Sequence, residues 1–133
     1  MLTTVTLVVR DYDEALEFYV GRLGFTLIED TPVPSQQKRW VVIAPAGTSG
    51  CRLLLAVASN DQQRSRVGNQ TGGRVSFFFH TKDFQRDYAA YRRQGVRFLE
   101  TPRHMSLTVW SPYLQTSTAT VGIYCSPRIN LLA

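Results

Sequence analysis

The stretch that decides the fold is Val8–Pro32, VVRDYDEALEFYVGRLGFTLIEDTP. A weaker copy of it spans Phe79–Pro102, FHTKDFQRDYAAYRRQGVRFLETP. Both stretches run from a strand end through an Asp and an amphipathic segment to a glycine, and both close with a second strand ending in Thr-Pro. Two copies of one small βα unit predict a pseudo-symmetric domain whose halves build a shared cleft.

Further strand-like runs complete a βαβββ module around the first copy, at about residues 1–58. Asp11 is the predicted N-cap of a helix that extends from Tyr12 to Leu23 and ends at Gly24. A turn is predicted at Pro32–Ser35. The strands are predicted at 4–9, 25–29, 39–44 and 51–57.

A polar, glycine-bearing linker at 59–73 leads to a second module at about 74–133. That module is predicted to open with a buried strand at 75–79, and Asp83 is expected to cap the helix that follows. Two more strands are predicted at 107–110 and 118–125. The whole chain is therefore expected to form one α+β domain, residues 1–133, from two βαβββ modules.

Composition narrows the classes of function. The chain has a net charge of +5, but its arginines are either grouped around the second predicted helix or scattered among acidic and apolar neighbours. This pattern favours a solvated basic face over a nucleic-acid surface. No apolar run approaches the roughly 20 residues that span a bilayer, and the first residues do not resemble a signal peptide. Cys51 and Cys125 are expected to be reduced thiols, and we expect a cytoplasmic protein without membrane or nucleic-acid partners.

The residues VTLVVRD, ALEFY and LGF occur in this order at Val5–Asp11, Ala15–Tyr19 and Leu23–Phe25. Together with the paired βαβββ modules, this motif order resembles that of the vicinal oxygen chelate superfamily. The superfamily contains glyoxalase I, bleomycin-resistance proteins, fosfomycin-resistance transferases and extradiol dioxygenases. The resemblance extends from Val5 to about Arg103. It implies a cupped sheet in each module and, usually, a divalent metal that polarises two adjacent substrate oxygens.

The ligand positions of the superfamily do not carry metal ligands in this chain. The first-strand His or Gln position falls on Thr4, and the acid of the fourth strand falls on Leu54. The histidine that opens the second module falls near Arg74 or Ser76. Because these side chains do not supply a converging set of oxygen or imidazole donors, we predict no metal site and no cofactor.

The other chemistry-bearing residues do not form a catalytic pattern. His80 ends a phenylalanine-rich strand, which favours a strand-end residue over a catalytic base, and His104 falls in a predicted loop. No nucleophile and base can be paired from the sequence. Gly68–Gly73 lacks the lysine of a phosphate-binding loop.

The superfamily's last strand typically resembles Tyr-Gly-Asn-x-Trp-Asp/Glu-Leu, and nothing after His104 matches it. However, the codons implied by Met105–Pro127 can be read in another frame, by joining the last base of each codon to the first two of the next. One permitted string is YEPYGVVAVLANIYGNRWDLLQP, whose Trp uses the GG of Gly122 and whose Asp uses the AT of Ile123. We therefore interpret the chain after about His104 as a frameshifted tail.

These observations favour a homodimeric protein that binds a small molecule in its cleft, of the glyoxalase and bleomycin-resistance type. A metal-dependent lyase or dioxygenase is the first alternative, and an antibiotic-sequestering resistance protein is the second. If the cleft binds a ligand, Trp40 and Phe77 would stack on it and Arg74 would pair with an anionic group. The alternative for each is a purely structural role, in the core for the two rings and at the surface for the arginine. The candidate ligand-binding residues are Thr4, Thr6, Trp40, Leu54, Arg74, Ser76 and Phe77.

Overall fold

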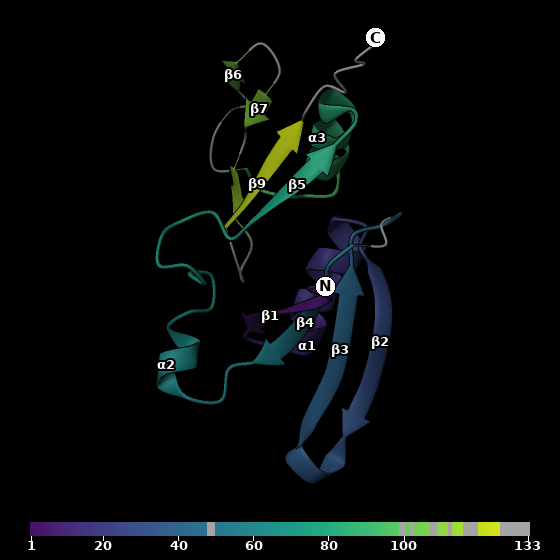
Figure 1. Cartoon of the computed structure of the whole chain (residues 1–133), viewed down its shortest axis with the longest axis vertical. Helices are drawn as coiled ribbons and strands as arrows, with labels where there is room; N and C mark the ends of the chain where they lie inside the picture. Colours follow the sequence, from purple (N-terminus) through teal and green to yellow (C-terminus); the bar gives the residue numbers. More distant parts are fainter. Residues whose placement is uncertain are drawn as a thin grey trace.

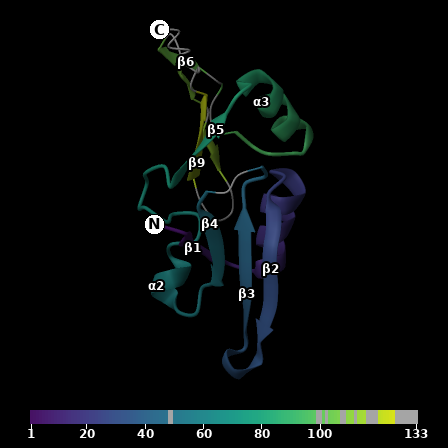
Figure 2. The same ribbon diagram turned by 45° about the vertical axis from the view of Figure 1, so that its right-hand side comes forward.

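The computed structural model describes residues 1–47, 50–98, 101, 103–106, 109–111, 113–115 and 120–125. The two modules follow one another along the long axis of the molecule (Figure 1). The first module contains β1 to β4, and the second contains β5, α3 and the strands that follow. The linker passes along the side of the molecule between them, as the turned view also shows (Figure 2).

The first module has the predicted βαβββ order. Its elements are β1 (Thr4–Val9), α1 (Tyr12–Leu16), the π-helical η1 (Glu17–Arg22), β2 (Thr26–Val33), the 3-10 turn η2 (Pro34–Gln36), β3 (Lys38–Ala44) and β4 (Arg52–Val57). The sheet order is β1-β4-β3-β2, in which β1 runs parallel to β4 and the other neighbours are antiparallel. The last strand of the module therefore lies beside its first.

Local chemistry explains the bounds of the helical segment. The Asp11 carboxylate accepts a hydrogen bond from the Glu14 backbone N–H at 2.8 Å, which satisfies one donor of the first turn, as predicted. The segment closes with a wider π turn, in which the Leu23 N–H donates to the Phe18 carbonyl at 3.0 Å. Gly24 follows with a φ of 74°, a left-handed conformation that glycine adopts without strain.

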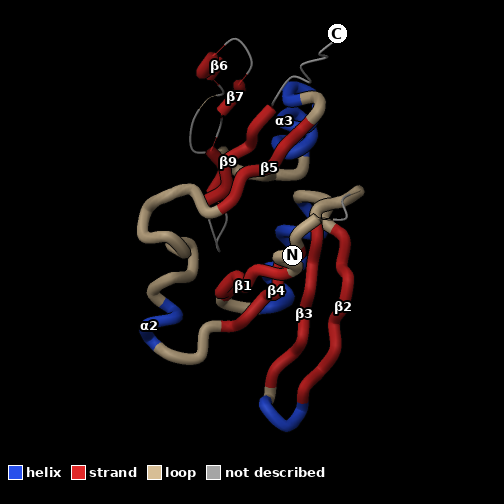
Figure 3. The backbone as a smooth tube through the Cα atoms, viewed as in Figure 1, coloured by secondary structure: helices blue, strands red, loops and turns tan. Residues whose placement is uncertain are grey.

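The turn predicted at Pro32–Ser35 begins later than expected. β2 continues through Pro32 to Val33, and η2 makes the connection. Pro32 is tolerated because β2 is an edge strand of the sheet, where a missing N–H need not break a ladder bond. As a result β2 and β3 form a long hairpin, whose η2 end is far from the second module (Figure 3).

The linker and the second module differ in detail from the prediction. A short helix, α2 (Asp61–Arg64), interrupts the predicted linker, and Asn60 caps it through a bond to the Gln63 N–H. The remaining elements are β5 (Phe77–Thr81), α3 (Phe84–Arg93), β6 (Arg103–Ser106), β7 (Val109–Ser111), β8 (Tyr113–Gln115) and β9 (Thr120–Cys125). Asp83 caps α3, as predicted.

The second module repeats the parallel pairing of its first and last strands. Its larger sheet has the order β5-β9-β8, with Phe77 opposite Val121, and β6 pairs with β7 apart from it. Of the strand predicted at 107–110, residues 109 and 110 belong to β7. Leu107 and Thr108 lie outside the described residues, as do residues 118 and 119 of the last predicted strand.

One apolar core connects the two modules. Leu7, Ile43 and Leu55 pack from the sheet against Tyr19 of η1, which is fully buried. Phe84 and Val96 of the second module belong to the same cluster. In addition, the rings of Phe25 and Phe79 lie 5.3 Å apart, and the Arg22 side chain donates to the Gly95 carbonyl at 3.4 Å. None of the helices among the described residues is long and apolar enough to cross a membrane.

Candidate functional site

Strand alternation gives the first sheet two different faces. The core residues of β1, β3 and β4 alternate along each strand and contact the helical segment, so the residues between them project to the opposite side. We call this opposite side the open face. Its members are Thr4, Thr6 and Val8 of β1, Arg52, Leu54 and Ala56 of β4, Lys38, Trp40, Val42 and Ala44 of β3, and Thr26, Glu29, Thr31 and Val33 of β2.

Strand pairing brings four of the predicted ligand-binding residues to this face. Thr4 pairs with Arg52 and Thr6 pairs with Leu54 between β1 and β4. Leu54 also pairs with Val42 of β3. Trp40 lies two residues before Val42 on β3, on the same face. The open face therefore has an apolar centre, formed by the partly exposed Leu54 and by Val42, which is only 5% exposed, and a threonine border on β1.

Trp40 gives the open face its exposed aromatic surface. Its side chain remains 45% exposed, although the burial of a large apolar ring is energetically favourable. Thr31 is its cross-strand partner, and the Thr31 hydroxyl donates to the Glu29 carboxylate at 3.1 Å. A ligand over Trp40 would thus meet an aromatic ring with a polar, hydrogen-bonded neighbour at its side.

The other three predicted residues precede or begin β5. Phe77 is partly buried and packs against the core cluster, so its stacking on a ligand stays a prediction, and the neighbouring Phe78 is the exposed ring at 68%. Arg74 is exposed and belongs to a turn in which its N–H donates to the Thr71 hydroxyl at 2.9 Å. The Ser76 hydroxyl is buried and has no hydrogen-bond partner among the residues that the structure describes. Among the described residues, no hydrogen bond or ion pair joins Arg74 or Ser76 to the open face, so their role in binding stays a prediction.

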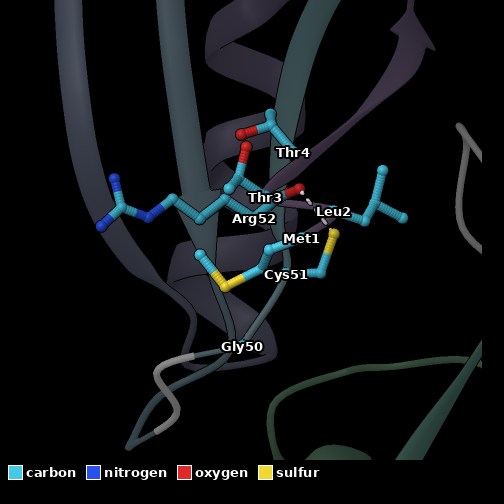
Figure 4. A pocket seen from close by; sticks show the side chains of 7 residues that line it. All are labelled: Met1, Leu2, Thr3, Thr4, Gly50, Cys51 and Arg52. Carbon is cyan, nitrogen blue, oxygen red and sulfur yellow. Dashed lines mark hydrogen bonds between the residues drawn. The ribbon is translucent and has the colours of Figure 1, made fainter.

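A cavity of about 480 Å³ lies where β1 and β4 begin (Figure 4). The backbone there is held by the Arg52 N–H, which donates to the Thr3 carbonyl at 2.9 Å, and the Cys51 thiol lies 3.5 Å from the Arg52 carbonyl. In Figure 4 the Arg52 side chain extends away from Met1 and Cys51. The cavity is lined by Met1, Leu2, Thr3, Thr4, Gly50, Cys51 and Arg52.

The sequence interpretation missed Arg52 and Val42. Arg52 lies two residues before Leu54, and Val42 lies two residues after Trp40. The signal for both was the period of two along a strand, which places them on the face of residues that were already candidates. Only the register of β4 against β1 and β3 shows that they become neighbours of Thr4 and Leu54.

An ion-pair network around Arg39 lies off the open face. Arg39 donates to the Asp30 carboxylate at 3.0 and 2.6 Å and to Asp13 at 2.9 Å, and its guanidinium lies 5.2 Å from the centre of the Tyr12 ring. The hydrogen bond from Arg39 lowers the pKa of Asp30 below its ordinary value. Asp30 pairs with the core residue Val41, so this network connects the β2–β3 hairpin to α1 and has no access to the open face.

The donor set on the open face does not fit a metal ion. Thr4 and Leu54 stand where a first-strand His or Gln and a fourth-strand acid would be required, and a guanidinium faces Thr4. Within the described ranges no three His, Cys, Asp or Glu side chains gather into a group that could hold a metal. The side chains of His80, His104 and Cys125 lie outside the described residues.

A βαβββ module and a second module of β5, α3 and four further strands, each with its first and last strands paired in parallel, define an α+β protein whose first sheet has one core face and one open face. The chain belongs to the Glyoxalase/Bleomycin resistance protein/Dioxygenase superfamily, because the family model matches residues 2–109. An uncharacterized protein of Shewanella frigidimarina is 52% identical to it over 99 residues, which cover 74% of this chain and 73% of that protein.

Solved structures show the same fold. The alignment with the crystal structure of UcmS2 covers 93% of this chain and 96% of the UcmS2 chain, with 20% sequence identity and a TM-score of 0.79. The structure of TnmS3, an antibiotic binding protein from Streptomyces sp. CB03234, covers 95% of both chains, with 21% identity and a TM-score of 0.72. At these identities the two structures bear on the fold alone.

Proposed function

We propose that this protein binds an amphipathic small molecule on the open face and uses no metal. The observation that carries the proposal is the half-exposed Trp40 beside the apolar centre of Leu54 and Val42. An aromatic ring next to an apolar floor, with threonine hydroxyls at the border, is typical of a site that stacks on a ligand and orients it with few polar contacts. Because TnmS3 is an antibiotic binding protein, it supports binding as a function within this fold.

Replacement of Trp40 tests the proposal directly. With 1-pyrenebutanamide as a neutral aromatic probe, Trp40→Ala is expected to weaken binding about tenfold or more, because stacking and buried apolar area are lost together. Trp40→Phe is expected to keep part of the affinity. Leu27→Ala is a matched control, because Leu27 is 43% exposed and pairs with the core residue Ile43 on the other face. Fluorescence anisotropy of the pyrene measures all three, and equal affinities for Trp40→Ala and Leu27→Ala would refute the site.

A metal-dependent lyase or dioxygenase remains the first alternative, because the superfamily model includes dioxygenases. Elemental analysis of the purified protein separates it from the proposal. The open-face donor set leads us to expect no stoichiometric metal, and Thr4→Ala should leave the metal content unchanged. A stoichiometric Zn, Ni, Mn or Fe that disappears with Thr4→Ala would contradict the metal-free proposal.

Antibiotic sequestration is the second alternative, and the likeness to TnmS3, an antibiotic binding protein, favours it. It shares the binding step with our proposal and differs only in the identity of the ligand and in its effect on the host. A turnover assay beside equilibrium binding distinguishes it from the enzyme. Binding without product, together with protection of a sensitive host that expresses the protein, would identify sequestration.

We also propose a cytoplasmic homodimer. The exposed thiol of Cys51 fits a reducing compartment, and proteins with this repeat complete their clefts by pairing modules within or across subunits. Size-exclusion chromatography with light scattering is expected to give twice the mass of one chain. A compact monomer at micromolar concentration would contradict the dimer.

Finally, we propose that the chain after about His104 is read in a shifted frame. The family model ends at residue 109, close to this position, and the match to the Shewanella protein extends over 99 residues. Both observations fit a tail that has lost the family sequence. The shifted reading, ending in Tyr-Gly-Asn-Arg-Trp-Asp-Leu-Leu, supplies the superfamily's last strand, and with it an acidic residue that the present tail lacks.

A further inference from the structure

The open face carries a positive charge at the end where β1 and β4 begin. Arg52 is exposed and lies on this face, where it pairs with Thr4 in the strand register. Of the seven described residues that line the cavity at this end, only Arg52 has a charged side chain. Among the residues that the structure describes, no carboxylate forms an ion pair with its guanidinium.

The position of Arg52 determines which charge this end of the face attracts. A guanidinium repels a cation but matches a carboxylate with two parallel hydrogen bonds. The threonine hydroxyls of Thr3 and Thr4 line the same cavity and can donate to the same anion. Glu29, the carboxylate of the open face, lies on β2, two strands away from β4, which is roughly 10 Å. Among the described residues, Glu29 forms no ion pair with Arg52, and its carboxylate accepts the Thr31 hydroxyl instead.

Arg52 and Trp40 lie at opposite ends of a line of open-face residues that passes through Leu54 and Val42. Val42 pairs with Leu54, Trp40 lies two residues from Val42, and Arg52 lies two residues from Leu54 in the opposite direction. Four residues of strand separate the two positions, which is about 13 Å. The partly exposed Leu54 forms the apolar floor between them, beside the buried Val42.

We propose that the ligand of the open face is an amphipathic carboxylate, whose anionic group binds Arg52 while its aromatic body extends over Leu54 toward Trp40. This inference rests on the proposed function, because it names the class of ligand for the same site. Arg52 supplies a positive charge directly opposite Thr4 in the strand register. The site therefore selects a negatively charged group on the ligand without a metal.

Two probes that differ only in charge test the inference. 4-(1-Pyrenyl)butanoate carries a carboxylate on a flexible chain, and 1-pyrenebutanamide is its neutral counterpart. In low-salt buffer at pH 7 the protein is expected to bind the carboxylate about tenfold more tightly than the amide, because a hydrogen bond to a charged group is stronger than a neutral one. The ratio is expected to fall in about 0.5 M NaCl, where charges at an exposed site are screened.

Variants of Arg52 assign the preference to this residue. Arg52→Gln is expected to abolish the preference for the carboxylate with little change in the affinity for the amide, and Arg52→Lys is expected to retain part of it. Arg97→Gln is a matched control, because Arg97 is also exposed and its loss changes the net charge equally. Since Arg52 is exposed, the melting temperature of Arg52→Gln should stay close to that of the parent, which excludes a folding defect.

Each result separates the inference from the function on which it rests. If the amide binds and depends on Trp40, but the carboxylate binds no better or Arg52→Gln leaves the ratio unchanged, the inference is overturned and the proposed function stands. If neither probe binds at about 1 mM, both are overturned. If Arg97→Gln reduces the ratio as much as Arg52→Gln, the preference reflects net charge alone and the inference is again overturned.

Discussion

A chain read in the shifted frame after His104 is expected to unfold at a temperature on the order of 10 °C higher than the chain with the present tail. The structure explains why the tail matters to stability, because β9 (Thr120–Cys125) lies between β5 and β8 and pairs in parallel with β5. The last strand therefore completes the sheet of the second module. Any residue there that cannot pack or pair weakens the whole module.

The size of the effect follows from the residues that the two frames encode. The present tail contains Pro112 and several Thr and Ser residues, where the shifted string has Val, Leu and Trp. A proline removes one ladder donor, and each lost apolar side chain removes packing, which together cost about 2–5 kcal/mol. Differential scanning calorimetry of both chains measures the difference.

Two results would contradict the frameshift. The first is a repaired chain that melts no higher than the present one. The second is a source gene that contains no alternative frame encoding the string. A useful control is Pro112→Ala in the present chain, which restores one donor and is expected to recover only a small part of the difference.

The sequence determines the first module well because its local signals agree with its tertiary role. β1 has the predicted bounds of Thr4–Val9, since a run of β-branched residues also supplies the core residues Leu7 and Val9. The caps Asp11 and Asp83 form the predicted bonds because each lies directly before an amphipathic segment. Such features depend on a few adjacent residues, which one sequence displays completely.

The candidate site was only partly predictable. It depends on the face of the sheet to which each strand residue belongs and on the pairing register between strands. Phe77–Phe79 is an uninterrupted aromatic run, so it has no alternation that tells the core face from the exposed one. The structure places Phe77 and Phe79 against the core and leaves Phe78 exposed. Likewise, nothing local to Arg52 indicates that Thr4 is its neighbour, because the two are far apart in the sequence and only the parallel pairing of β1 with β4 joins them.

Phe25→Ala is expected to destabilise the protein by about 3–5 kcal/mol, because it leaves a cavity where the two modules meet. Phe25 is 5% exposed, and its ring centre lies 5.5 Å from that of Tyr19 in η1 and 5.3 Å from that of Phe79 in β5. This chain of rings crosses from the helical segment of the first module to the first strand of the second. Contacts between aromatic rings at these distances add to the free energy of burial.

Phe78→Ala is the matched control for this substitution. It removes the same ring from β5, but Phe78 is 68% exposed, so its loss is expected to change the free energy of unfolding by no more than about 0.5 kcal/mol. Urea denaturation followed by circular dichroism measures both variants. Similar losses for Phe25→Ala and Phe78→Ala would show that the modules do not depend on this contact. A second transition in Phe25→Ala alone would instead show that the modules unfold separately once Phe25 is gone, which identifies this ring as the element that couples them.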